Sequence, residues 1–433
     1  MLVANDNARS RQLRDVLMRF LLAATLIASI QAPILGQEWT RFRGPNGAGQ
    51  SESIFPAKFN PANYAWKKKL PGAGHSSPVL WGNKLFVLGS DRKTATRMVI
   101  CMDAKSGAEH WAKVYLSETH KLHSRSSYAS CTPAVDEQRV YLAWSTHRTT
   151  TFMALDHDGE EVWKLDLGRW VGSHGFGTSP MLYKDMVILH NSLQVDQLDP
   201  DQGEPGEGFM LAVDRKSGKE IWRSPRPGAR VCYSVPAIYQ PPDGGAEQLI
   251  CCDTKEGIFS LNPLNGELNW KTEGLIKMRS VSSPVIAGGL ILGSTGSGGG
   301  GNYVVAIRPG NKPEIAYQIR QSAPYVPTPV AYNGLLFLFF DKGVVSCVDL
   351  STGSVYWRER LSEGFSGSPI RVGDKVYCIS DVGELICVAA SKQFKMLGES
   401  NLGEPSRSTP AVHKGRMYMR TNSHLICVDQ SSS

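Results

Sequence analysis

The chain has 433 residues, with 43 Gly, 25 Pro and a formal net charge of +7 at pH 7. Residues 1–36 hold four Arg and two Asp, a net of +2, which leaves +5 spread along the remaining residues. Such a mild charge gives no case for nucleic-acid binding, and abundant Gly and Pro favour short strands joined by turns.

Residues 1–36 are predicted to be a secretory signal peptide. Basic residues precede the apolar run 20–30, and small residues follow it up to Gly36, near which we expect cleavage. The run is too short to cross a membrane comfortably, so we expect no transmembrane span in the mature chain. No Cys follows it to carry a lipid anchor, and Met18 is a possible alternative start. We therefore expect an exported protein, periplasmic or secreted.

Residues 37–63 are irregular and rich in Gly and Pro, and we expect them to lie across the rest of the molecule as an N-terminal arm. The next residues, 64–70, have an outer-strand pattern, with no inner strands before them. Residues 64–430 form the predicted folded domain.

A tripeptide of the type Ser-Pro-Val occurs eight times in this domain. Its prolines are Pro78, Pro133, Pro180, Pro236, Pro284, Pro329, Pro369 and Pro410. The intervals between them run from 40 to 56 residues. A period of this size is typical of propellers and other repeat architectures.

Each repeat contains the pattern of four short strands. After the proline come two apolar strands joined by a tight turn, as in residues 79–88. A third strand ends in a small residue, an apolar residue and usually Asp, and a Gly turn leads to a fourth strand that usually reaches Trp, as in 212–222. Eight such units predict an all-β, eight-bladed propeller of four-stranded antiparallel blades, because radial packing buries both faces of each sheet. We expect the Trp to wedge between blades and the small residue to allow close packing.

The two ends of the chain are expected to share one blade. After Pro410 the sequence has only three strands, and residues 64–70 supply one outer strand without partners. The N-terminal strand should therefore complete the last blade and close the ring.

The nine cysteines are more consistent with a buried core than with a disulfide framework. Cys101, Cys347, Cys387 and Cys427 occupy the small-residue position of the third strand. Cys251 and Cys252 are adjacent in a strand, where alternate side chains point to opposite faces, so a plain strand is favoured over a vicinal disulfide.

Three local patterns resemble functional motifs without the context that they need. Gly296-x-Gly298-x-x-Gly301 fits the dinucleotide fingerprint, but a strand follows it, so we interpret it as a hairpin turn. His120 and His123 lack identifiable further zinc ligands, and the acidic insertion 190–208 misses the EF-hand spacing. We interpret these as solvated loops and predict no metal site and no catalytic residues.

The most promising place for a binding site is the axial mouth, where the loops before the prolines converge. Aromatic and cationic side chains there could bind a planar anionic ligand, a peptide or a carbohydrate, or could only cap the channel. The candidate ligand-binding residues are His75, Tyr128, Trp170, His174, Phe176, Tyr233, Arg279, Tyr325, Phe365 and Arg407.

The repeat resembles a known family. Ala-x-Asp-x-x-Thr/Ser-Gly-x-x-x-Trp, as in 212–222, is similar to the tryptophan-docking repeat of the pyrroloquinoline-quinone (PQQ)-type propellers, and the resemblance covers nearly the whole mature chain. The segment 39–47 also resembles the opening of many exported PQQ-like proteins of planctomycete-type bacteria.

The resemblance implies two functions. The quinoprotein alcohol dehydrogenase branch holds PQQ and Ca²⁺ on the axis, with a stacking Trp, a vicinal disulfide and an Asp base. Here Trp170 is the only Trp among the mouth residues, and the loops offer no clear Glu/Asn/Asp set. The other branch is similar to the outer-membrane β-barrel assembly lipoprotein, a scaffold without cofactor. We favour a monomeric scaffold that binds cell-envelope proteins or a small ligand, with a PQQ- and Ca²⁺-dependent dehydrogenase as the alternative.

Overall fold

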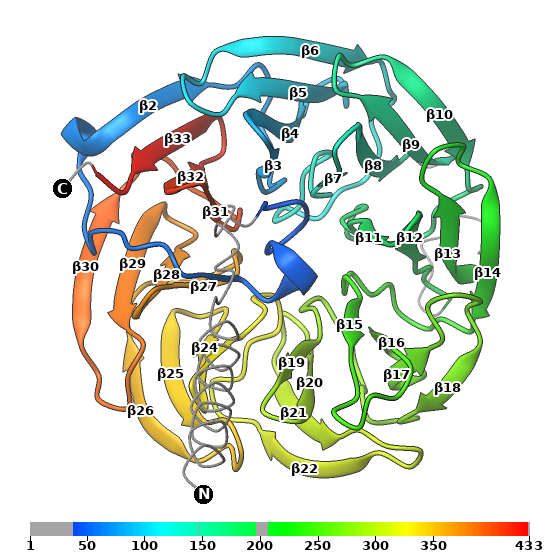
Figure 1. Ribbon diagram of the computed structural model, residues 1–433, viewed down its shortest axis with the longest axis vertical. Helices are drawn as coiled ribbons and strands as arrows, with labels where there is room; N and C mark the ends of the chain where they lie inside the picture. Colours follow the sequence, from blue (N-terminus) through cyan, green and yellow to red (C-terminus); the bar gives the residue numbers. More distant parts are fainter. Residues whose placement is uncertain (1–37, 147, 196–206, 432–433) are drawn as a thin grey trace, which may run out of the picture. The chain divides into compact units, whose positions relative to one another are not determined.

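The computed structural model describes residues 38–146, 148–195 and 207–431. Within them, the strands form eight sheets arranged as a ring around a central channel (Figure 1). This arrangement confirms the predicted all-β, eight-bladed propeller. The predicted signal peptide lies outside the described residues, as do residues 196–206 of the acidic insertion. No helix in the described segments combines the length and the apolar character that a membrane span requires.

The first four sheets follow the chain in order. The first contains β3 (Val79–Trp81), β4 (Lys84–Ser90), β5 (Arg97–Asp103) and β6 (Glu109–Tyr115). The second contains β7 (Ala134–Val135), β8 (Arg139–Ser145), β9 (Thr150–Asp156) and β10 (Glu161–Asp166). The third contains β11 (Met181–Tyr183), β12 (Met186–Asn191), β13 (Gly208–Asp214) and β14 (Glu220–Arg226). The fourth contains β15 (Ala237–Tyr239), β16 (Gln248–Asp253), β17 (Gly257–Leu261) and β18 (Leu268–Lys271).

The other four sheets include the N-terminal strands. The fifth contains β19 (Val285–Ala287), β20 (Leu290–Thr295), β21 (Tyr303–Arg308) and β22 (Glu314–Ile319). The sixth contains β23 (Val330–Tyr332), β24 (Leu335–Phe339), β25 (Val344–Asp349) and β26 (Val355–Arg360). The seventh contains β27 (Ile370–Val372), β28 (Lys375–Ile379), β29 (Glu384–Ala389), β30 (Met396–Asn401) and the parallel β1 (Gln50–Ser51). The eighth contains β31 (Ala411–His413), β32 (Arg416–Arg420), β33 (His424–Asp429) and β2 (Tyr64–Lys69).

The ring closes as predicted, by pairing the two ends of the described chain. β2 lies antiparallel to β33, with Trp66 opposite Cys427 and Lys69 opposite His424. Without β2, the edge of β33 would expose unpaired backbone groups.

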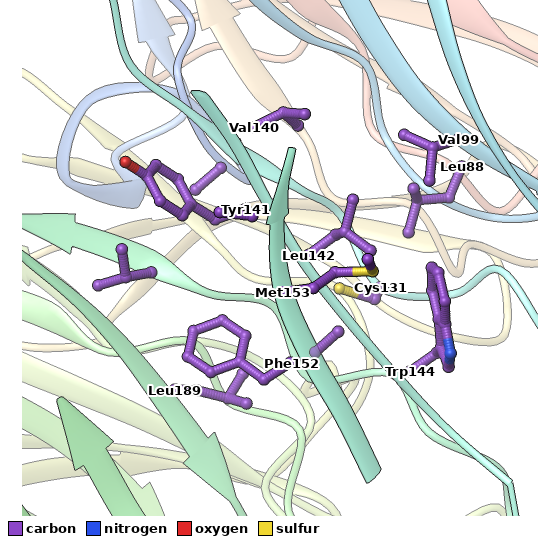
Figure 2. Close-up of a cluster of buried hydrophobic side chains, with 14 of the residues drawn as sticks. Leu88, Val99, Cys131, Val140, Tyr141, Leu142, Trp144, Phe152, Met153 and Leu189 are labelled. Atoms are coloured by element: carbon purple, nitrogen blue, oxygen red, sulfur yellow. The ribbon is translucent and has the colours of Figure 1, made fainter. Parts of the chain in front are cut away.

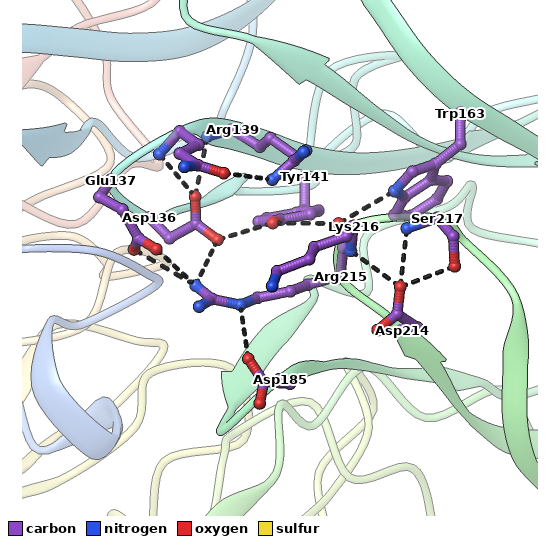
Figure 3. Close-up of polar contacts among 11 residues, drawn as sticks. Asp136, Glu137, Arg139, Tyr141, Trp163, Asp185, Asp214, Arg215, Lys216 and Ser217 are labelled. Atoms are coloured by element: carbon purple, nitrogen blue, oxygen red, sulfur yellow. Dashed lines mark hydrogen bonds and ion pairs between the residues drawn. The ribbon is translucent and has the colours of Figure 1, made fainter.

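In five blades the Trp of the outer strand docks onto the turn of the following blade, whereas the indole N–H of Trp270 in the fourth blade donates to the Gln248 amide oxygen of its own blade at 2.9 Å. The indole N–H of Trp163 on β10 donates to the carbonyl oxygen of Arg215 at 3.1 Å (Figure 3). In the same turn the Asp214 carboxylate accepts hydrogen bonds from the Ser217 backbone N–H and hydroxyl at 2.8 and 2.6 Å. Trp66, Trp111, Trp222 and Trp357 make the equivalent hydrogen bond, and Tyr317 makes it through its hydroxyl. The wedge role predicted for the Trp is therefore confirmed, with a polar contact added.

The turn glycine and the small residue of the third strand both make room for this Trp. Gly218 has φ 72°, and a Cβ built on it would lie 2.7 Å from the Trp163 ring. Across the strand ladder, Trp163 stands opposite Ala154. Cys101 and Cys347 stand opposite Trp111 and Trp357 in the same way.

The Ser or Thr before seven of the eight prolines explains the repeated tripeptide. The backbone N–H of this residue in one blade donates to the hydroxyl of its counterpart in the next, as from Ser368 to Thr409 at 2.9 Å. Within the described residues seven such bonds run between neighbouring blades; their donors are Ser77, Thr132, Val235, Ser283, Thr328, Ser368 and Thr409. The ring lacks the eighth bond because Val235 has no hydroxyl to accept from Ser179.

Residues 39–51 pass over the inner strands of several blades. The short 3₁₀ turn η1 (Pro45–Gly47) lies in the centre of the ring (Figure 1). Arg43, 1% exposed, donates to the carbonyl oxygens of Thr328, Pro329 and Pro369 at 2.7 to 2.9 Å. This guanidinium therefore joins the sixth and seventh blades, and it satisfies carbonyls that would otherwise be buried without donors.

The seventh blade, which lacks the docking Trp, is filled by the segment after β1. Gly398 occupies the position opposite Cys387, and a Cβ there would lie 2.3 Å from the carbonyl oxygen of Ala57. Phe55 and Phe59 are buried beside this site in the core of the seventh and eighth blades. A second 3₁₀ turn, η2 (Pro61–Asn63), then leads into β2.

The core lies between blades. Figure 2 shows Leu142 and Met153 facing Leu88 and Val99 of the preceding blade, and Phe152 facing Leu189 of the next. All nine cysteines fall within the described residues and are buried and free. Cys251 and Cys252 belong to different core clusters on the two faces of β16, in agreement with the predicted plain strand.

Candidate functional site: the axial cavity

A cavity of about 900 Å³ opens on the propeller axis, lined by loops that precede the inner strands and by the turns beside them. Six of the ten candidate residues line it: His75, His174, Tyr233, Arg279, Tyr325 and Arg407. They meet because each inner strand starts at this end of its blade. Phe42, from the N-terminal arm, also lines the cavity.

The other four candidates are buried in the packing around the cavity rather than on its wall. The rings of Trp170 and Phe176 pack edge to face with centroids 6.0 Å apart, and those of Phe365 and Phe339 do so with centroids 5.1 Å apart. The hydroxyl of Tyr128 donates to the carbonyl oxygen of His120 at 2.7 Å. These four side chains pack against neighbouring loops and support them from behind the wall.

Sequence reasoning missed several polar residues on the wall. They are His123 and Arg125, from the loop after β6; Arg320, after β22; and Asp341 and Lys342, from the turn between β24 and β25. The position of Asp341 and Lys342 at the mouth could have been predicted from the repeat. In a blade whose first strand leaves the mouth, the second strand returns to it, so the turn between strands two and three lies at the same end.

The wall carries an excess of positive charge. Among the described residues, Arg125, Arg279, Arg320, Lys342 and Arg407 line the cavity, against one carboxylate, Asp341. No salt bridge joins any of these five cations to a carboxylate within the described part of the chain.

Asp341 is held in place by the backbone. Its carboxylate accepts the N–H groups of Tyr325 at 2.6 Å and Val326 at 3.0 Å. Burial nevertheless raises the pKa of Asp341 to about 6, because the two hydrogen bonds only partly offset the loss of solvent. The described acidic group on the wall is therefore neutralised as the pH falls through about 6.

Arg279 is the most deeply placed cation, with 8% of its surface exposed. Its Nη2 donates to the Gln194 amide oxygen at 2.9 Å and to the Ser173 hydroxyl at 3.4 Å. Its Nε, which is buried, has no hydrogen-bond partner among the described residues. The guanidinium is therefore oriented by neutral groups, and its charge is not compensated by a contacting carboxylate.

The histidines of the wall are neutral at pH 7. Burial, followed by the charges of Arg407 and Arg420, lowers the pKa of His75 to about 3. Burial and the charge of Arg279 lower the pKa of His174 to about 4. The His174 ring also stacks on His123, with centroids 4.8 Å apart. These shifts follow from the positive charge around the imidazoles as well as from burial.

The residues present do not fit a PQQ–Ca²⁺ group. A hard divalent cation needs several oxygen ligands, and the cavity wall offers the single carboxylate of Asp341. Among the described residues, no three His, Cys, Asp or Glu side chains are grouped as metal ligands. Trp170 does not line the cavity, and Cys251 and Cys252 are buried in a strand away from its wall.

Comparison with known proteins places the chain among similar propellers. A family profile described as outer membrane protein assembly factor BamB matches residues 57–206 and 320–433. The outer membrane protein assembly factor BamB of Moranella endobia is 23% identical over 322 residues, which are 70% of this chain and 76% of that protein.

Two solved structures share the fold. BamB from Moraxella catarrhalis superimposes with a TM-score of 0.58 and 12% identity, over 84% of this chain and 97% of that one. Quinohemoprotein alcohol dehydrogenase from Comamonas testosteroni gives 0.67 and 13%, over 92% and 81%. At these identities the likeness concerns the fold alone.

Proposed function

Because the chain belongs to the family of the outer membrane protein assembly factor BamB, we propose that it is a monomeric scaffold of the cell envelope that binds partner proteins and catalyses no reaction. The observation that carries this proposal is the family match over both the N-terminal and the C-terminal blades. The sequence of residues 1–36 supports a place outside the cytoplasm, periplasmic or secreted.

The construction of the ring supports a scaffold role. Docked aromatic side chains, the Ser/Thr hydrogen bonds and the β2–β33 pairing join the blades into one closed body. In a closed ring the loops are already held at fixed positions. Binding of a partner therefore costs little conformational entropy for ordering these loops.

A PQQ- and Ca²⁺-dependent dehydrogenase is the competing function, and the shared fold with a quinohemoprotein alcohol dehydrogenase is what favours it. The donor set of the cavity argues against it, because among the described residues Asp341 supplies the single carboxylate on the wall for a cation.

Two measurements test the proposal. Cross-linking and affinity capture of the mature chain from its own cell envelope should enrich outer membrane assembly proteins, relative to a β2-deleted control. Dye-linked alcohol oxidation with added PQQ and CaCl₂ should stay at background. Steady turnover in the second assay that is lost in Asp341→Asn would establish the dehydrogenase instead.

A further inference from the structure

The axial cavity has the features of a site for a small anionic ligand. Among the described residues its five cations outnumber its one carboxylate, and the Arg279 guanidinium lines it while 8% exposed and without a contacting carboxylate. Uncompensated charge in a largely buried position is costly unless a counter-charge binds.

The cations come from different sides of the channel. Arg279 precedes β19 and Arg407 precedes β31, and the blades of β23 and β27 lie between them (Figure 1). Arg320 and Lys342 come from the fifth and sixth blades, near Arg279 in the ring order. A ligand that neutralises both sides needs negative groups at more than one point.

The glycine loop between β20 and β21 adds backbone donors to the same wall. Gly298, Gly300 and Gly301 line the cavity, and Gly300 and Gly301 have φ 107° and 73°. A Cβ on Gly298 or Gly300 would meet no atom within 4 Å, so packing does not require glycine there. Backbone N–H groups of such turns bind anions, and within the described chain the N–H groups of Gly298 and Gly301, three residues apart, have no protein acceptor, whereas that of Gly300 donates to the Ser297 carbonyl oxygen at 3.1 Å.

The wall also carries aromatic side chains, against which the apolar part of a ligand can pack. Tyr233, Tyr325 and Phe42 line the cavity between the cations. The Tyr233 hydroxyl is buried and has no hydrogen-bond partner in the protein. A volume of about 900 Å³ is in the range of sites for small molecules.

We propose that this cavity binds a small organic anion with at least two phosphate or carboxylate groups, which pair with Arg279 and the glycine loop on one side and with Arg407 on the other. The inference goes beyond the proposed scaffold function and does not depend on which protein partner is bound.

The test is calorimetric titration of the purified mature chain with pyrophosphate, with citrate and with neutral sorbitol. Pyrophosphate or citrate should bind at one site, and more weakly as NaCl is added, whereas sorbitol should not bind. Arg279→Gln and Arg407→Gln should each weaken binding by roughly tenfold or more, because each removes a charge-assisted contact. Arg308→Gln, at an exposed arginine outside the cavity, is the matched control and should bind like the wild type.

The outcomes separate the ligand classes. Binding of pyrophosphate alone assigns the site to phosphate groups, and binding of both probes extends it to carboxylates. The proposal is overturned if the wild type binds neither anion, or if Arg279→Gln and Arg407→Gln bind as tightly as Arg308→Gln. If the buried Arg279 cannot be replaced without unfolding, Arg407→Gln measured beside Arg308→Gln decides the test, because Arg407 is only partly buried. Protein capture from the envelope is measured separately, so either proposal can fail alone.

Discussion

The ring of Ser/Thr hydrogen bonds at the start of the inner strands can be tested by two substitutions. One removes a hydroxyl that accepts a bond, and the other adds a hydroxyl where the eighth bond is missing. Thr409→Val keeps the shape of a side chain that is 2% exposed, but it deprives the Ser368 N–H of its acceptor at 2.9 Å. A buried donor left unpaired costs about 1–3 kcal/mol. In a chain of this size, that loss should lower Tm by about 1–4 °C.

Val235→Thr is the converse change, since it supplies a hydroxyl where the ring lacks one for the Ser179 N–H. It should raise stability by about 0.5–1.5 kcal/mol. Thermal unfolding followed by circular dichroism, with each variant beside the wild type, measures both shifts. Simple hydrophobicity predicts the opposite signs, because Val is the more apolar residue in each pair. A higher Tm for Thr409→Val together with a lower one for Val235→Thr would refute the role of the ring.

Three further predictions concern the ring and its buried groups. Deleting residues 60–72 should leave β33 as an open edge and lower Tm, and an unchanged melting curve would contradict closure by β2. Gly218→Ala should be destabilising by about 1 kcal/mol or more, because the new Cβ meets the Trp163 ring at a positive φ; the same variant in a Trp163→Ala background should cost less. The folded pKa values of His75 and His190 are about 3 and about 4, below the usual value of 6.5. Between the folded pKa values and pH 6.5, the unfolded chain therefore binds more protons than the folded chain. Stability should therefore fall as the pH drops from about 6.5 to 4, and His190→Gln should flatten the dependence of Tm on pH.

The candidate site was only partly predictable. Arg279, Arg407 and His75 could be placed on the axis, because each lies just before a repeated proline and the repeat fixes where that loop points. Trp170 and Phe365 occupy equivalent positions in the sequence, yet they turn into the core. Whether such a side chain lines the cavity or packs in the core depends on the space that neighbouring loops leave. The sequence of a single repeat does not predict that space.

The number of blades, the strand order within each blade and the closure of the ring follow from local repetition in the sequence, because each repeat carries its own turn, strand and docking residues. Only the tertiary structure decided what the channel contains. It brings Phe42 and Arg43 of the N-terminal arm to the axis, and it sets Asp341 among five cations contributed by different loops. The Arg43 contacts join residues 285 to 326 positions apart. The energies of the charges around Asp341 depend on burial and mutual distance, which the repeat pattern does not encode.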